Sequence, residues 1–166
     1  MSALEEALMR SDPVRAVHMA VPSVPVAALV HELCFNRHFE LVRLIEEYNG
    51  EMAEAAVTIR SDDDVLQFVE YLQTNLLPII PAGTRTELQP HLEKESVLRA
   101  LQSHQFDLAK AIDIAVSVMA SSCAPIRDED INELRRLQET TNTDKLVSRL
   151  MRIVDFMRLD FFAYAL

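Results

Sequence analysis

Histidine and cysteine side chains, which are common zinc ligands, gather in one short stretch of the sequence. His31, Cys34 and His38 follow one another at offsets of three and seven, so one face of a helix would bring them together. The zinc-protease helix motif, however, needs a second histidine four residues after the first, and position 35 is phenylalanine. We expect the helix here to end near Asn36, before His38, and no fourth ligand is apparent. We therefore expect ordinary core and surface roles for these residues, with no metal or other cofactor.

Two runs of acidic residues, Asp62–Asp64 and Asp128–Asp130, could in principle coordinate a hard cation. Neither run has the alternating ligands and the glycine of a calcium-binding loop. Ser61 precedes the first run, and a hydroxyl acceptor followed by negative charge stabilises the free N–H groups of a helix's first turn. Each run therefore predicts the start of a helix. Arg127, beside the second run, is available to pair with a carboxylate of another helix.

Nucleophilic catalysis has no local signature in this sequence. Cys123 has no histidine close to it in the chain, and Ser121 and Ser122 lack the glycines of a nucleophile elbow. Catalytic triads assemble in space rather than along the chain, so an enzyme stays open as a third alternative. We expect a protein that is not an enzyme and assign no catalytic residue.

The composition is that of a globular helical protein in a reducing compartment. The 166 residues are 49% apolar and 25% charged, a balance that supports a folded core. Two glycines and no tryptophan leave little material for hairpin turns or phosphate-binding loops, which favours helices. The two cysteines, Cys34 and Cys123, are too few for a disulfide framework and suit the cytoplasm.

Charge and hydropathy narrow the class of partner. The formal net charge of −10 repels phosphate backbones and anionic lipids, so we expect protein partners and no nucleic acid. No window approaches eighteen consecutive apolar residues, and the segment Met1–Glu6 has neither the basic end nor the apolar stretch of a signal peptide. We expect a protein that is neither secreted nor inserted into a membrane.

Apolar residues recur at helical spacing along most of the chain. We expect an N-terminal arm with a short helix over residues 1–24 and a helical domain over residues 25–166. The fold class is all-α, an irregular antiparallel bundle or array of about seven to nine helices. The predicted helices cover residues 25–36, about 40–57 with a turn signal at Asn49-Gly50, a helix from Ser61 through Leu76, a pair between Thr84 and Gln102 around Pro90, one from Asp107 through Met119, one from Asp128, and one from Thr143 or Asp144 to the end.

The last residues form the most apolar segment of the chain. An exposed patch of this kind is usually covered by another surface. We therefore predict that the end of the last helix contacts a partner protein through Phe161, Phe162, Tyr164 and Leu166.

Four stretches resemble motifs of one family. Cys123-Ala-Pro-Ile-Arg-Asp-Glu-Asp-Ile131 is similar to its "CAPxRDEE" signature, and Ile153-Val-Asp-Phe-Met-Arg-Leu-Asp160 is similar to its "VLDLMKxD" helix. Leu29-Val-His-Glu32 with Asn36 and Phe39 resembles "LxHE…NxxF". Leu77-Pro78 with Thr84-Arg85 resembles "LLPxHTR". Together these stretches resemble the T-complex protein 11 family, over roughly residues 26–164, as a short form similar to the N-terminal half of longer relatives.

The resemblance implies an all-helical protein with no established catalytic centre. It also implies a cytoplasmic role in signalling through cyclic AMP and its kinase, and a place in sperm flagella in animals. We expect a protein-binding scaffold or adaptor that is a subunit of a larger ciliary or flagellar assembly. The alternative is a regulator of cyclic AMP and protein kinase A signalling.

The signature residues are interpreted as structural. Pro125 interrupts one helix, Asp128 caps the next, and Arg127 is hypothesised to be a clamp that reaches a carboxylate of Asp155 or Asp160. The remaining signature positions are Cys123, His31 and Glu32.

Overall fold

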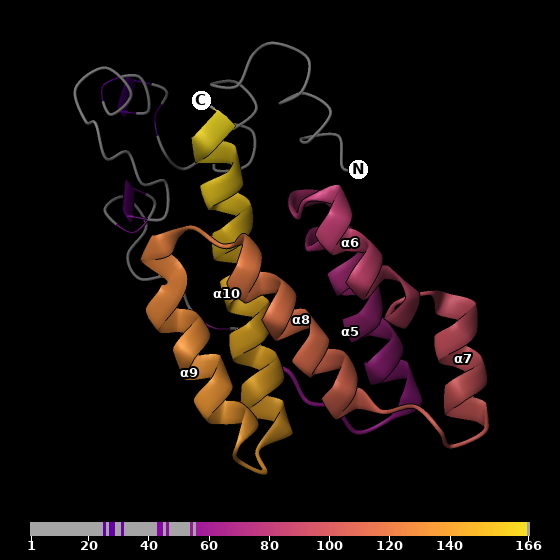
Figure 1. Cartoon of the computed structure of the whole chain (residues 1–166). Coiled ribbons are helices and arrows are strands. Elements are labelled where there is room, and N and C mark those ends of the chain that lie inside the picture. Colours follow the sequence, from indigo (N-terminus) through magenta and orange to yellow (C-terminus); the bar gives the residue numbers. More distant parts are fainter. Residues whose placement is uncertain are drawn as a thin grey trace. The chain divides into compact units, whose positions relative to one another are not determined.

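The computed structural model is helical throughout the part of the chain that it describes, and no strand occurs there (Figure 1). It describes residues 25, 27, 28, 31, 43, 44, 46, 54 and 56–165, with side chains up to residue 161 in the last helix. The chain divides into two compact units, one made of Met1–Ala53 and Arg158–Leu166 and the other of Glu54–Met157. The all-helical prediction is therefore confirmed for the described residues.

Helix α5 (Asp62–Asn75) starts where the first acidic run predicted a helix. The Ser61 hydroxyl accepts a hydrogen bond from the Asp64 N–H at 3.2 Å, and the Asp64 carboxylate accepts one from the Arg60 N–H at 2.9 Å. These bonds satisfy two backbone N–H groups at the start of the helix. The short 3₁₀ helix η1 (Leu77–Ile79) follows α5.

The predicted pair of short helices around Pro90 is present. Its two members are α6 (Ala82–Leu88) and α7 (Lys94–Gln102), and the 3₁₀ helix η2 (Gln89–His91) lies between them in the chain. Arg85 ties the start of this region to the preceding turn, because its guanidinium donates to the Leu77 carbonyl at 3.0 Å and to the Ile80 carbonyl at 3.2 Å. The loop between α5 and α6 is therefore held by one side chain.

Helices α8 and α9 are joined by a single turn. The elements are α8 (Leu108–Ser122), the 3₁₀ helix η3 (Pro125–Arg127) and α9 (Asp128–Gln138). The Asp107 carboxylate caps α8 by accepting from the Lys110 N–H at 3.0 Å, as predicted. The capping role expected of Asp128 is wrong, because Asp128 is the first residue of α9 and the cap position belongs to Arg127. Asp128 instead adds negative charge to the first turn.

Helix α10 (Thr143–Ala165) begins at one of the two predicted positions. Its capping group comes from Asn142, whose side-chain oxygen accepts from the Lys145 N–H at 3.1 Å. The Asp144 carboxylate instead accepts a hydrogen bond at 2.9 Å from the N–H of Ile59, in the segment before α5. Its residues up to Met157 belong to the Glu54–Met157 unit, and its residues from Arg158 on belong to the other unit.

One hydrophobic core holds the Glu54–Met157 unit together. Helix α8 packs against both α6 and α9, and α5 packs against α7 (Figure 1). The predicted apolar stripes face this core, in which the following predicted residues are at most 8% exposed: Val65, Val69, Leu72, Leu76, Ile112, Ala115, Val116, Met119, Ile131, Leu134, Leu146, Leu150, Ile153 and Met157. Burial of these side chains is the main source of the unit's stability.

The predicted helix over residues 40–57 does not reach its predicted end. Positions 54 and 56–60 have no helical conformation. The backbone N–H groups of Val57 and Ile59 bond to side chains of α10 rather than to carbonyls four residues earlier, which explains the difference. The arm over residues 1–24 lies outside the described residues, as does most of the predicted helix over residues 25–36. The expected count of seven to nine helices includes these parts of the chain.

Candidate partner-binding site

The η3 turn between α8 and α9 reverses the usual placement of charged and aliphatic side chains. Arg127 is only 6% exposed, whereas Ile126, the residue before it, is 56% exposed. The Arg127 N–H donates to the Ala124 carbonyl at 2.9 Å and closes the turn. Because consecutive side chains of a 3₁₀ helix point roughly 120° apart, only one of the two can face the core. Here the arginine faces inward and the isoleucine faces solvent.

The buried arginine lies against an aromatic ring and a carboxylate. Its guanidinium carbon is 5.1 Å from the centre of the Phe156 ring, and its Nη1 is 3.8 Å from Oδ2 of Asp130. Arg152 places its own guanidinium carbon 5.1 Å from the same ring. Phe156 is 6% exposed, so its ring offers a desolvated surface to which both cations are attracted. These contacts anchor η3 to α10.

The sequence led to the hypothesis that Arg127 is a clamp that reaches a carboxylate of Asp155 or Asp160. Arg127 is buried and joins η3 to α10, as the hypothesis requires. The Arg127 Nη1 lies 3.8 Å from Oδ2 of Asp130, and the Tyr71 hydroxyl donates to Oδ1 of Asp155 at 2.6 Å. That hydroxyl is also 2.8 Å from the Met151 carbonyl and so links α5 to α10. Asp160 belongs to the other compact unit.

Two exposed acidic residues lie two and three positions after the exposed isoleucine in the chain. Asp128 and Glu129 follow η3 and are exposed, and Pro125 is exposed on the other side of Ile126. Cys123 is half-buried, with Sγ 3.9 Å from Oδ1 of Asp128. The turn therefore presents an apolar tip with an acidic border.

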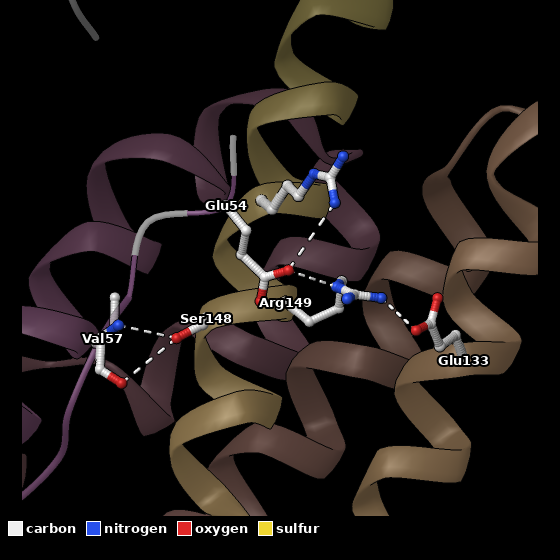
Figure 2. A network of polar contacts seen from close by, with 6 residues as sticks. Glu54, Val57, Glu133, Ser148 and Arg149 are labelled. Atoms are coloured by element: carbon white, nitrogen blue, oxygen red, sulfur yellow. Dashed lines mark hydrogen bonds and ion pairs between the residues drawn. The ribbon is translucent and has the colours of Figure 1, made fainter. Parts of the chain in front are cut away.

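A polar network on α10 fixes the position of α9 (Figure 2). The Arg149 guanidinium bonds to Glu54 at 2.8 Å through Nε and to Glu133 of α9 through Nη1. Arg152 adds a second cation, with Nη1 3.9 Å from the same Glu54 oxygen. The hydrogen bond to Glu54, followed by the bond and attraction to Glu133, raises the pKa of Arg149 despite partial desolvation.

The segment before α5 is bound to the same face of α10. Figure 2 shows Ser148 between the two backbone groups of Val57, whose N–H donates to Ser148 Oγ at 2.9 Å. The Ser148 hydroxyl in turn donates to the Val57 carbonyl at 3.4 Å. Together with the Asp144 bond to Ile59, these contacts fix residues 57–59 to α10. Polar contacts therefore hold α9 and residues 57–59 to α10, in addition to the packing of the hydrophobic core.

Outside η3 and the Arg149 network, the described part of the chain has few clusters of residues that could carry chemistry. There, no group of three or more His, Cys, Asp or Glu side chains could hold a metal ion. A hollow of about 320 Å³ is lined by His91, Ser96 and Asp107 among others. The Asp107 carboxylate accepts from the Lys110 N–H and serves as the cap of α8. The Asp107 carboxylate that lines the hollow therefore has a structural role in capping α8.

Several predicted site residues lie outside this arrangement. Phe161 is half-buried, whereas the side chains of Phe162, Tyr164 and Leu166 lie outside the described residues. His31 is exposed on a helical segment, and Glu32, Cys34 and His38 lie outside the described residues. The partner contact predicted at the end of α10 therefore stays a prediction.

Comparison with known families decides the membership of this chain. The family model described as T-complex protein 11 matches residues 29–166, which is most of the sequence. The chain belongs to the T-complex protein 11 family. No solved structure matches it. Within the described part of this family member, no helix is both long enough and apolar enough to cross a membrane.

Two parts of the site were not predicted from the sequence. The exposure of Ile126 depends on which way the η3 turn faces, and residue types alone do not specify that direction. The Arg149 network joins residues that are 95 and 16 positions apart, so no local spacing reveals it. One signal was present: Arg149 and Arg152, three positions apart, lie beside the apolar stripe of their helix, and charges at the edge of a buried face need partners.

Proposed function

We propose that this member of the T-complex protein 11 family is a non-enzymatic scaffold that binds other proteins as a subunit of a larger assembly. We further propose that this assembly is a cytoplasmic one of the cilium or flagellum, which is the role that the family resemblance implies. The observation that carries the proposal is the reversed placement of Arg127 and Ile126 in η3. A chain that buries an arginine while exposing the adjacent isoleucine gives up stability, and a contact at the isoleucine supplies a physical reason.

The turn has the features of a binding hot spot. An apolar anchor contributes most when it is presented rigidly, because little conformational freedom is then lost on binding. Arg127 fixes η3 against Phe156, and the Arg149–Glu133 bond fixes α9 behind it. Ile126 is 56% exposed, and it is the one large hydrophobic residue classed as exposed in the described part of the chain.

The border of the tip indicates the chemistry of the partner. Asp128 and Glu129 are exposed beside Ile126, so a matching surface has an apolar pocket with Lys or Arg at its rim. Full burial of an isoleucine side chain stabilises by about 1.5–3 kcal/mol, and roughly half of that remains for a partner to supply. The loss of this contact corresponds to about a tenfold loss of affinity.

The test compares Ile126→Asp with the wild type in cells that express the chain. Affinity capture followed by quantitative mass spectrometry should show at least one partner that falls roughly tenfold in the variant. Ala109→Asp adds the same charge at an exposed position in the first turn of α8 and should leave capture unchanged. Unfolding curves should show that both variants keep the wild-type stability to within about 0.5 kcal/mol.

The outcome also separates the alternatives. Ile126-dependent partners that are structural proteins support the scaffold. Subunits of the cyclic-AMP-dependent kinase among those partners would instead support the regulator that the family resemblance offers. An identical partner set for the wild type and Ile126→Asp would refute the role of η3. Charge substitution at Phe161 and Phe162, tested in the same way, decides whether the end of α10 forms a second contact.

A further inference from the structure

A second surface, formed by other residues than those of η3, is a groove along α5. The groove has a volume of about 290 Å³. Leu66 and Val69 form its apolar part, and Asp63 and Glu70 contribute carboxylates. Lys94, at the start of α7, closes the other side. A volume of this size is at the low end for ligand pockets and suits one or two side chains rather than a whole cofactor.

The helix that forms the groove is strongly acidic. Its sequence contains Asp62, Asp63, Asp64 and Glu70 and no lysine or arginine. Asp63 and Glu70 are exposed and seven residues apart, which places them on the same face with a separation of roughly 10.5 Å along the helix. Leu66, three residues after Asp63, lies between them and is half-buried. An apolar contact is thus set between two carboxylates.

We propose that this groove binds a basic amphipathic helix of a partner protein. The occupant inserts one side chain of leucine size against Leu66 and places a Lys or Arg beside each of Asp63 and Glu70. Because 10.5 Å is roughly two helical turns, the two cations of the occupant are seven residues apart with the apolar residue between them. This inference rests on the proposed function, since it assumes that the chain binds proteins, but it names a different surface.

Other classes of ligand fit the groove less well. The net charge of −10 and the acidic helix repel nucleic acid and anionic membranes. A single metal ion cannot bridge two carboxylates that are roughly 10 Å apart along the helix, since cation–oxygen bonds are about 2–2.6 Å long. Lys94 contributes one positive charge to the lining, but the carboxylates of Asp63 and Glu70 outnumber it, so charge complementarity favours a cationic helical partner.

The experiment uses a designed peptide as the probe. An acetylated and amidated helical peptide of about 20 residues, long enough to form helix in water, carries two lysines seven residues apart with a leucine three after the first. Fluorescence anisotropy of the labelled peptide with the full chain should show saturable binding that weakens as salt is raised. A second peptide of identical composition, with its lysines five residues apart, should bind about fivefold more weakly, because one of its cations points away.

Matched protein variants locate the binding. Asp63→Lys combined with Glu70→Lys should weaken binding of the first peptide at least roughly tenfold, because attraction becomes repulsion at two positions. Asp62→Lys combined with Glu95→Lys makes the same change in net charge at exposed acidic positions that do not line the groove. This control should reduce binding far less. Circular dichroism confirms that each variant remains helical.

Three outcomes would overturn the inference. The first is no saturable binding of the first peptide, the second is equal binding of the two peptides, and the third is an equal loss in the two double variants. The proposed function is judged separately, since Ile126→Asp should leave peptide binding unchanged. If Ile126→Asp loses partner capture while the wild-type chain does not bind the peptide, the inference about the groove is refuted and the proposed function is not.

Discussion

The Arg149 network provides the sharpest test of how the fold holds its candidate binding turn. We expect Arg149→Met to destabilise the protein by about 2–3 kcal/mol. Two charge-assisted bonds are lost, each worth about 1.5–3 kcal/mol when buried, and the partial exposure of all three side chains reduces their sum. Arg149 and Glu54 are 20% and 21% exposed, while Glu133 is 39% exposed, so Glu54 carries most of the loss. Arg152, 3.9 Å from Glu54, compensates in part.

Urea unfolding followed by circular dichroism measures this change directly, and the melting temperature should fall by about 4–12 °C. Arg149→Lys retains the charge but not the planar fork that bonds both carboxylates, so it should recover only part of the loss. Arg99→Met, at an exposed position of α7, should change stability by less than about 0.5 kcal/mol. A loss for Arg149→Met no larger than this control would refute the reasoning.

The pH dependence of this effect has a defined sign. The folded protein raises the pKa of Arg149. A base with a raised folded pKa contributes stability below its unfolded pKa and loses that contribution as pH rises through the folded value. For an arginine this occurs only in strong alkali. The difference between the wild type and Arg149→Met caused by arginine titration should therefore be constant from about pH 6 to pH 9.

Three further predictions test the supporting contacts. Arg127→Ala should cost about 3 kcal/mol in urea unfolding, because it empties the space beside Phe156 and removes a buried charge from its partners; unchanged stability would refute the clamp. Tyr71→Phe should cost about 1–2 kcal/mol, since the hydroxyl bonds a carboxylate, and a neutral result would show that water replaces it. The pKa of Asp64 is lowered chiefly by the hydrogen bond from the backbone N–H of Arg60. The ionised Asp64 carboxylate therefore stabilises the folded protein above the ordinary aspartate pKa, and this stabilisation is lost as pH falls through the lowered pKa. Acid titration of stability should therefore be flatter in Asp64→Asn, and identical titrations would contradict this assignment.

Much of the fold could be predicted because its signals are local. Ser61 and Asp107 have side chains that bond the first free N–H groups of α5 and α8, so residue type alone marks both starts. At α10 the sequence predicted a start at Thr143 or Asp144 and did not single out Asn142, the residue before them. The structure selects Asn142, because the Asp144 carboxylate is engaged by Ile59 from another part of the chain. Local propensity could not decide between them.

The candidate site depended on contacts between distant parts of the chain. The sequence indicated that Arg127 needs a partner, and the structure supplies Phe156 and Asp130. It did not indicate that Ile126 would be exposed, since an isoleucine between a proline and an arginine is normally the residue expected to be buried. The direction of η3 is set by the ring of Phe156 on α10, which no spacing rule connects to this turn.

The two proposed surfaces would act on different stages of binding. An apolar anchor such as Ile126 makes its contact only after the surfaces meet, so its loss should raise the dissociation rate of a complex. The carboxylates of Asp63 and Glu70 attract a basic partner before contact, so their loss should lower the association rate and its dependence on salt. With a net charge of −10, the chain already steers cationic partners toward itself. A partner that combines a basic helix with an apolar pocket rimmed by Lys or Arg would therefore be captured by charge and retained by the isoleucine.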